Sequence, residues 1–422
     1  MAAPLPRLRA DLDLIPSPLP EQPGLVVRDP LRYSPATLII PPLLARCLGC
    51  FDGSHDEGEL HATLARLVGR AAVAGAARRL IDALSEAGFL QDQRFEDLRG
   101  ARERGFAACD ARLPVHAGNA YPAEPAPLTE TLRSHFDATP AGATAPASAP
   151  ICAIVAPHVS PEGGRASYAS AYRALPADHA DRVFVVLGTS HYGEPDRYGL
   201  TRKPFATPFG LAPTEVRLVD DLARAAPDAV AVEDYCHAVE HSIEFQVVFL
   251  QHLFGPEVRI LPVLCGPFAA GPRAGRPPEA SDRVARFIGA LGELAAREGR
   301  RLSFVLGVDF AHIGRRYGDG FEARVRQGPL AMVEARDRAR LERIAAGDAV
   351  GFWELVAWRT RPVDDPGPRE DELKWCGTSP LYTFLRALPD ARGRLLCYEQ
   401  WNIDHASVVS FGALAFPENE RA

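Results

Sequence analysis

The chain has 422 residues, 47% of them hydrophobic and 24% charged, and a formal net charge of −7 at neutral pH. This composition is ordinary for a globular protein, and the length suffices for one large α/β domain and a small one. The acidic balance offers no basic face to nucleic acid, no apolar run could cross a bilayer, and the N-terminus lacks a signal peptide's apolar core. We therefore expect a cytoplasmic protein with mostly reduced cysteines.

Residues 1–29 are expected to form an N-terminal tail, and residues 30–91 are the first segment predicted to fold. The text PATLIIPPLLARCLGCF predicts a helix, a second helix follows an Asp-Gly turn, and a third ends at Gly88 before the short strand FLQ. Three helices and a terminal strand indicate a small helical, winged-helix-like domain. Cys47 and Cys50 lie in the first helix, where they are predicted to face the core and not to form a zinc site.

One part of this segment has a recognisable pattern, RDPLRYSPATLIIPPLLARCLGCFDGSHDEGELHATL. It resembles the PqqD-like peptide-chaperone domains that accompany radical-SAM enzymes acting on peptides. The resemblance implies that this domain binds a peptide, and a generic helical accessory domain is the alternative. The charged sequence of residues 92–112 then predicts an exposed helix or a linker.

Residues 113–418 are predicted to form an α/β domain with a mostly parallel sheet sandwiched by helices. Two apolar runs, ICAIVAPH and RVFVVLGTSH, end in His158 and His191 and flank the helical text SYASAYRAL, which predicts a strand–helix–strand unit. A third run, RLSFVLGVDFAHIG, ends with Asp309 and His312. Because open α/β sheets bind ligands at the carboxyl ends of their strands, we expect neighbouring strands and one shared site.

Further polar residues come at predicted helix starts. Glu240 and His241 precede Ser242, a predicted N-cap, and Cys376 comes just ahead of a helix whose predicted N-cap is Ser379. The positive end of a helix dipole favours a thiolate. A thiolate beside neutral imidazoles suits Fe, Cu or Zn. Taken singly, each histidine could instead cap a loop, and the cysteine could be a small buried residue.

Six motifs in this order, APH, TSH, EHSIE, LPV, DFAH and CG, resemble the Memo family, known in prokaryotes as AmmeMemoRadiSam system protein B. The resemblance covers roughly residues 113–418 and includes VHAGNAYP near the start of that range. It implies a fold like the LigB-like class III extradiol dioxygenases, which carry non-haem iron. The metal ligands that it implies are His158, His191 and Cys376. The surrounding catalytic, polar side chains would be Asp309, His312 and His241.

The resemblance also implies a function. It indicates a metal-dependent, dioxygenase-like redox protein that uses Fe(II), with Cu or Zn as alternatives, and O₂ or another oxidant. Its expected partners are a radical-SAM enzyme, an AMMECR1-like protein and a peptide bound by the N-terminal domain. The text APHVSPEGG departs from the family's APHAGY, which suggests a changed substrate.

Two other functions remain open at this point. The first is a non-catalytic metal- or peptide-binding partner of a radical-SAM enzyme. The second is a hydrolase with Cys376 as nucleophile and with His312 and Asp309 as its base and orienting carboxylate. Metal content separates the hydrolase from the redox protein, and oxygen uptake separates the redox protein from the binding partner.

Overall fold

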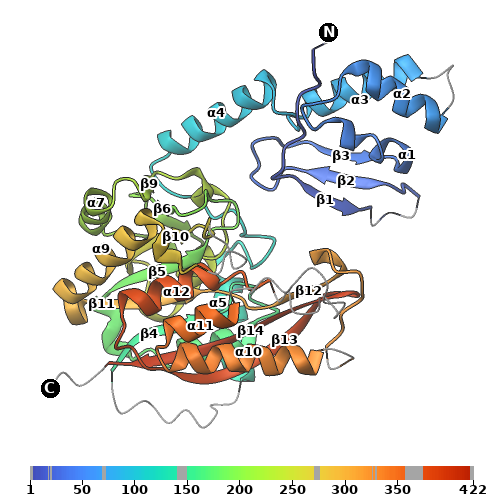
Figure 1. The fold of residues 1–422 in the computed structure, drawn as a ribbon. Coiled ribbons are helices and arrows are strands. Elements are labelled where there is room, and N and C mark those ends of the chain that lie inside the picture. Colours follow the sequence, from blue (N-terminus) through green and yellow to red (C-terminus); the bar gives the residue numbers. More distant parts are fainter. Residues whose placement is uncertain are drawn as a thin grey trace. The chain divides into compact units, whose positions relative to one another are not determined.

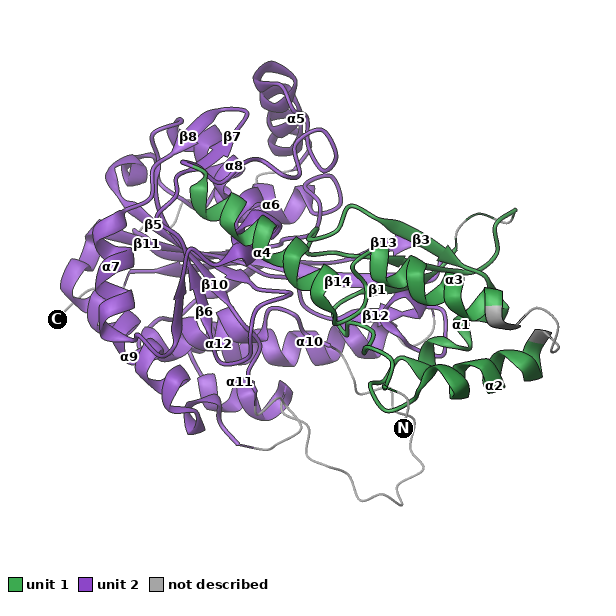
Figure 2. Ribbon diagram, turned by 90° about the horizontal axis from the view of Figure 1, so that it is seen from above, with its two compact units in different colours: residues 1–109 green, residues 110–422 purple. Residues whose placement is uncertain are grey.

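The computed structural model describes residues 3–17, 19, 21–68, 73–139, 150–269, 276–325, 327, 330–356 and 374–418. The chain divides into two compact units, Met1–Cys109 and Asp110–Ala422 (Figure 2). Each unit has a hydrophobic core of its own. The two units are therefore described separately.

The N-terminal unit contains a small antiparallel sheet beside its helices (Figure 1). Its strands pair in the order β1-β2-β3, with bounds Asp13–Pro16, Leu25–Arg28 and Thr37–Ile40. The winged-helix-like prediction was therefore not supported, and β1 and β2 lie in the segment expected to be a tail. The helix predicted across β3 was wrong because Thr-Leu-Ile-Ile favours a strand, and Pro41 and Pro42 prevent a helix from continuing through it.

The helices of this unit follow the sequence pattern more closely. They are α1 (Pro42–Ala45), α2 (Glu57–Val68), α3 (Val73–Glu86) and α4 (Gln93–Ala108), with a 3₁₀ turn at Leu48–Cys50. Gly88 has φ +68° after α3, as predicted for a left-handed cap. Cys47 and Cys50 are buried in the core, which confirms that prediction. The charged segment is α4, whose N-cap Asp92 accepts from the Phe95 amide.

The second unit is built on a nine-stranded mixed sheet, with strand order β12-β14-β4-β11-β5-β10-β6-β9 and β13 paired to β14. Its four central strands are parallel: β4 (Ile151–Ala156), β11 (Leu302–Gly307), β5 (Val183–Thr189) and β10 (Arg259–Cys265). The outer strands are β6 (Tyr198–Leu200), β9 (Val230–Val232), β12 (His312–Gly314), β13 (Arg394–Asp404) and β14 (Ser407–Pro417). A separate hairpin joins β7 (Phe205–Thr207) and β8 (Gly210–Ala212).

Helices cover both faces of this sheet (Figure 2). One face carries α5 (Pro125–Ala138), α6 (Arg165–Tyr172) and α8 (Glu244–Phe254). The other carries α9 (Asp282–Glu298), α10 (Leu330–Ala345), α11 (Ala349–Val356) and α12 (Thr378–Ala387), with α7 (Val216–Ala225) packed on α9. This arrangement confirms the predicted α/β architecture. Among the described helices, none combines the length and apolarity needed to span a membrane.

Candidate metal centre

Three neighbouring strands bring the predicted residues to one edge of the sheet. Strands β4, β11 and β5 are adjacent and parallel, as predicted. His158, Asp309 and His191 each lie two residues beyond the end of one of these strands. Because parallel strands end at the same edge, the three side chains meet in one place.

Three imidazoles form a compact group at this edge: His158, His191 and His241. The ring centroid of His158 lies 5.0 Å from that of His191 and 5.1 Å from that of His241. The centroids of His191 and His241 are 5.0 Å apart. One ligand nitrogen of each ring lies within 4.8 Å of the other two, so the group could hold a metal ion. His241, expected in the polar shell, is thus also a candidate ligand.

The Nδ1 atom of each of these rings is occupied by a protein acceptor. His158 Nδ1 donates to the Gly307 carbonyl oxygen at 3.0 Å. His191 Nδ1 lies 3.0 Å from both carboxylate oxygens of Glu240, and His241 Nδ1 lies 3.1 Å from its Oε1. A proton on Nδ1 leaves Nε2 with a free lone pair, which is the tautomer that a metal requires.

Glu240 is the shared anchor of two of these rings, and no role was assigned to it from the sequence. Its carboxylate also accepts the backbone amides of His191 (3.0 Å), His241 (2.8 Å) and Ser242 (3.2 Å). Burial alone would raise the pKa of Glu240, but the charges and hydrogen bonds of His191 and His241 hold it well below its usual range. Its signals in the sequence were its position directly before His241 and its place at the start of the EHSIE motif.

Cys376 adds a sulfur to the group. Its Sγ lies 3.4 Å from His158 Nε2 and 3.5 Å from the Asp309 carbonyl oxygen. Burial would raise the pKa of this thiol, but His312 and His158 lower it well below the usual value, which favours the thiolate. Cys376 immediately precedes the N-cap of α12, as expected.

The electrostatics of His158 are set by its anionic neighbours. Burial would lower the pKa of His158, but the charges of Asp309 and Cys376 outweigh it and raise the pKa to about 9. Asp309 is fixed because its Oδ1 accepts the backbone amides of His158 (2.9 Å) and Val159 (3.2 Å). The carboxylate therefore holds the loop that presents the His158 ring.

His312 faces the thiolate from β12. Its Nδ1 donates to the Phe310 carbonyl oxygen at 3.0 Å, and its ring meets Tyr317 edge-on at 4.9 Å. Burial opposes protonation, but the negative charge of Cys376 raises the pKa of His312 above its ordinary value. The structure thus brings together all six predicted site residues, and their roles as ligands or catalytic groups remain predictions.

Both N-caps predicted beside the site were wrong. The N-cap of α8 is Ile243, and the hydroxyl of Ser242 donates to the Thr189 carbonyl oxygen at 2.8 Å. The N-cap of α12 is Gly377, and the hydroxyl of Ser379 donates to the Cys265 carbonyl oxygen at 3.1 Å. In both cases the serine ties a helix start to the end of a central strand, a contact that local sequence does not reveal.

A glycine in β11 allows the loop with Glu240 and His241 to approach the sheet. A Cβ on Gly307 would lie 2.2 Å from the Ser242 carbonyl oxygen, so Gly307→Ala should displace this loop. We expect it to lower the free energy of unfolding by roughly 1–3 kcal/mol, as overpacked sites do, and to weaken metal binding. Thermal unfolding and Co(II) titration measure both effects. Gly289→Ala is the control, since a Cβ there has no neighbour within 4 Å; equal behaviour of the two variants would contradict the steric argument.

A buried ion pair supports the same loop from outside the group of histidines. Arg112 pairs with Glu244, and both side chains are fully buried. The guanidinium also donates to the carbonyl oxygens of His237 (2.8 Å) and Glu240 (2.6 Å). Glu244 in turn accepts the His116 amide at 3.0 Å, so the VHAGNAYP segment is tied to the loop as well. Sequence reasoning missed Arg112 because its partners are more than 120 residues away.

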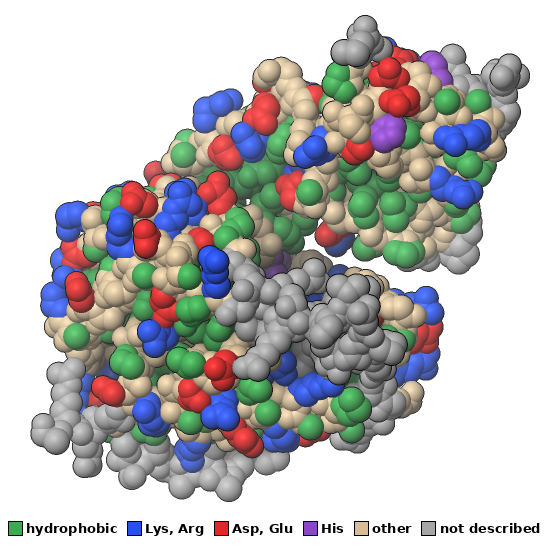
Figure 3. Space-filling view, viewed as in Figure 1, with side chains coloured by type: hydrophobic (Ala, Val, Ile, Leu, Met, Phe, Trp, Pro, Cys, Tyr) green, Lys and Arg blue, Asp and Glu red, His purple; other side chains and the backbone are tan. Residues whose placement is uncertain are grey.

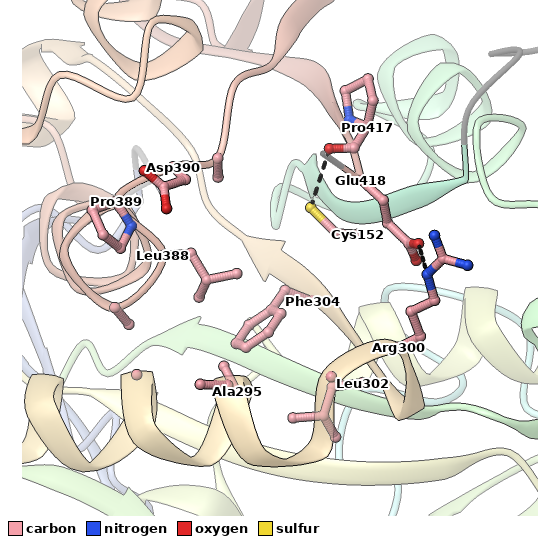
Figure 4. Close-up of a pocket in the computed structure, with 15 residues that line it drawn as sticks. Cys152, Ala295, Arg300, Leu302, Phe304, Leu388, Pro389, Asp390, Pro417 and Glu418 are labelled. Carbon is pink, nitrogen blue, oxygen red and sulfur yellow. Dashed lines mark hydrogen bonds and ion pairs between the residues drawn. The ribbon is translucent and has the colours of Figure 1, made fainter. Parts of the chain in front are cut away.

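A cavity of about 890 Å³ lies elsewhere in this unit (Figure 4). Its lining includes Cys152 near the start of β4, Leu302 at the start of β11, and Leu388 just after α12. These positions belong to the opposite end of the sheet from His158 and Cys376. None of the six predicted site residues lines the cavity, so it is not part of the candidate metal centre.

Comparisons with known proteins agree with this architecture. A family model described as "Memo-like protein" matches residues 112–415. A MEMO1 family protein of Aquifex aeolicus is 28% identical over 299 residues, which covers 70% of this chain and 73% of the relative. One from Methanosarcina barkeri is 25% identical and covers 72% of this chain and 98% of the relative.

A solved structure of an uncharacterized protein from Escherichia coli K12 aligns with 63% of this chain and 99% of its own, at 14% identity and a TM-score of 0.34. That similarity is too low to bear on the fold or the site. The family model, by contrast, spans most of the second unit. This chain therefore belongs to the Memo-like protein family.

Proposed function

We propose that this protein is a metal-dependent redox protein in which His158, His191 and Cys376 bind Fe(II), with Cu or Zn as the alternative metals. The observation that carries the proposal is the convergence of a thiolate-favouring cysteine with imidazoles whose Nδ1 atoms are already occupied. A thiolate and neutral imidazoles form a donor set that suits these metals. Three protein ligands would leave coordination positions open, as catalytic sites require.

When bound, the metal would supply electron transfer to O₂ or another oxidant. The protein's own groups would control protons and orientation. His312 donates from Nδ1 to the Phe310 carbonyl oxygen, so Nε2 is the atom that holds or moves a proton beside Cys376. Asp309 orients His158 through the backbone, and Glu240 orients His191 and His241.

Metal analysis and oxygen uptake test this proposal. We expect anaerobically purified protein to contain close to one equivalent of iron or copper, and the iron-loaded protein to consume O₂ in the presence of ascorbate. Protein loaded with redox-inactive Zn(II) is the control and should consume O₂ at the background rate. Protein that binds no metal would overturn the proposal and favour the hydrolase with Cys376 as nucleophile.

A peptide-binding role beside a radical-SAM enzyme is the second candidate, and one observation favours it. Hydrophobic side chains gather on the face of the N-terminal unit that Figure 3 shows. Leu14 in β1 and Leu43 in α1 are 44% and 49% exposed. In the described part of this sheet, β1 and β3 each pair on one side only. An extended peptide can add to such an edge.

The test of this second role is fluorescence anisotropy of labelled precursor-like peptides with the full chain. Leu14→Asp should weaken the binding if the sheet is the peptide site. A radical-SAM enzyme and an AMMECR1-like protein are the further partners that we propose, and co-purification tests both. Unchanged anisotropy with the wild-type chain would contradict the peptide-binding role.

A further inference from the structure

A fully buried carboxylate on α10 is hydrogen-bonded to two segments of the candidate metal centre. Asp337 has no exposed surface. It accepts hydrogen bonds from Trp375 Nε1 at 2.7 Å, from the Tyr398 hydroxyl at 2.8 Å and from the Ser410 hydroxyl at 2.5 Å. Trp375 adjoins Cys376, and Ser410 contacts the loop that ends at His312.

Each of these hydrogen bonds runs toward Asp337, so its carboxyl group is the acceptor in all three. The indole of Trp375 can only donate. The hydroxyl of Ser410 already accepts the Ala311 amide at 2.9 Å, so its own proton is directed to Asp337. The hydroxyl of Tyr398 accepts from a glutamine side chain at 3.0 Å and donates to Asp337 in the same way. Three donors therefore converge on one acceptor.

The first connection leads from Asp337 to the thiolate. The Trp375 ring is stacked on Phe310 at 4.6 Å and 16°, and its Nε1 is held by Asp337, so the orientation of the indole is fixed. The peptide that follows carries Cys376. Its far side is held by the amide of Gly377, which donates to the Asp309 carbonyl oxygen at 3.1 Å. A rotation of Trp375 would therefore move the Cys376 sulfur.

The second connection leads from Asp337 to the acid–base histidine. Ser410 on β14 uses its hydroxyl to bond the Ala311 amide, and its main chain bonds Phe310 and Ala311 at 2.8 and 2.9 Å. These contacts fix the loop between Asp309 and His312. The hydroxyl is oriented by Asp337, so the carboxylate supports this loop as well as the cysteine.

We propose that Asp337 is a positioning residue that sets the Cys376 sulfur and the His312 ring relative to one another. A buried polar group such as Asp337 is weak evidence for stability, since apolar residues of similar volume often pack as well. Its hydrogen bonds with Trp375 and Ser410 instead specify the orientation of two separate segments. The inference rests on the proposed function in one respect, namely that these two segments serve a metal.

Four variants separate positioning from general packing. Asp337→Asn keeps the size but cannot accept all three donors, Trp375→Phe deletes the connection to Cys376, and Ser410→Ala deletes the one to the His312 loop. Tyr398→Phe is the matched control, because it deletes one hydrogen bond to the same carboxylate but neither connection. All four are compared by thermal unfolding to establish that they fold.

Hydrogen exchange of the metal-free protein is the first readout, so it does not depend on the proposed metal. We expect Trp375→Phe to speed exchange in residues 376–383 and Ser410→Ala to speed it in residues 309–314. Asp337→Asn should affect both segments and Tyr398→Phe neither. The proposal would be overturned if the variants raised the exchange rate equally throughout the protein, or if Tyr398→Phe raised it in these two segments as much as the other variants do. If Asp337→Asn does not fold, the other three variants still decide it.

Co(II) binding is the second readout, followed by the thiolate-to-cobalt charge-transfer band. We expect Asp337→Asn and Trp375→Phe to raise the Kd by roughly 10–100-fold and to alter this band, as groups that orient metal ligands do. Tyr398→Phe should match the wild type. Wild-type protein that binds no Co(II) would count against the proposed function alone, whereas folded variants with wild-type exchange and wild-type Kd would overturn the role of Asp337.

Discussion

Replacing Arg112 with methionine is expected to lower the free energy of unfolding by roughly 3–5 kcal/mol, the usual cost of breaking a buried ion pair from one side. Glu244 would keep its charge in a site with no exposed surface, and the carbonyl oxygens of His237 and Glu240 would lose their donor. His237 lies just before the loop that carries His241, and Glu240 belongs to that loop. We therefore expect weaker metal binding in addition to a lower midpoint in urea.

Arg217→Met is the matched control for this variant. Arg217 also forms an ion pair, with Glu298 at 2.8 Å, but its side chain is 48% exposed. Exposed pairs contribute roughly 0–1 kcal/mol, so this variant should unfold close to the wild type. Equal losses in the two variants would show that burial of the Arg112 pair is not what matters. Arg112→Lys should fall between them, because an ammonium cannot reproduce the forked contacts of a guanidinium.

Replacing Cys376 with serine is expected to reduce metal affinity more than replacing His312 with alanine. A metal would hold the sulfur as a thiolate, and a serine hydroxyl is a much poorer ligand for Fe, Cu or Zn. His312 contacts the sulfur but is not a proposed ligand, so its loss should weaken binding by roughly 10–100-fold. Isothermal titration with Co(II) or Zn(II), under anaerobic conditions, measures both.

His241→Ala distinguishes two ligand sets. The three imidazoles of His158, His191 and His241 are close enough to hold an ion without the sulfur. If Cys376→Ser keeps full affinity while His241→Ala loses it, the ligand set is three histidines and Cys376 is not a ligand. If Cys376→Ser loses affinity and His241→Ala loses less, the set is the one that we propose.

The strand-end histidines were predictable because their signal is local. A buried parallel strand is a continuous apolar run, and the residue that follows it must lie at the carboxyl edge of the sheet. His158 and His191 were therefore predicted at this edge from the runs ICAIVAPH and RVFVVLGTSH. Asp309 and His312 were predicted there from the run RLSFVLGVDFAHIG. The family motifs then brought Cys376 to the same group.

Local pattern was less reliable where two elements compete for the same residues. The segment Thr37–Ile40 was predicted as helix because the sequence beside it has a helical pattern, yet it is the edge strand β3. Ser242 and Ser379 were predicted as N-caps, yet each hydroxyl bonds a carbonyl at the end of a central strand. The strand-favouring residues of β3 and the two prolines after it decided the first case, and a tertiary partner decided the other two.

The sequence by itself determined which residues form the central sheet and which side chains follow its strands, because hydrophobic periodicity is a property of neighbouring residues. Only the tertiary structure decided what holds those side chains in place. Glu240 reaches His191 across 49 positions, Arg112 reaches Glu244 across 132, and Asp337 reaches Ser410 across 73. Such pairs have no local signature, since a buried polar group is satisfied by whatever partner the packed fold brings within hydrogen-bonding distance.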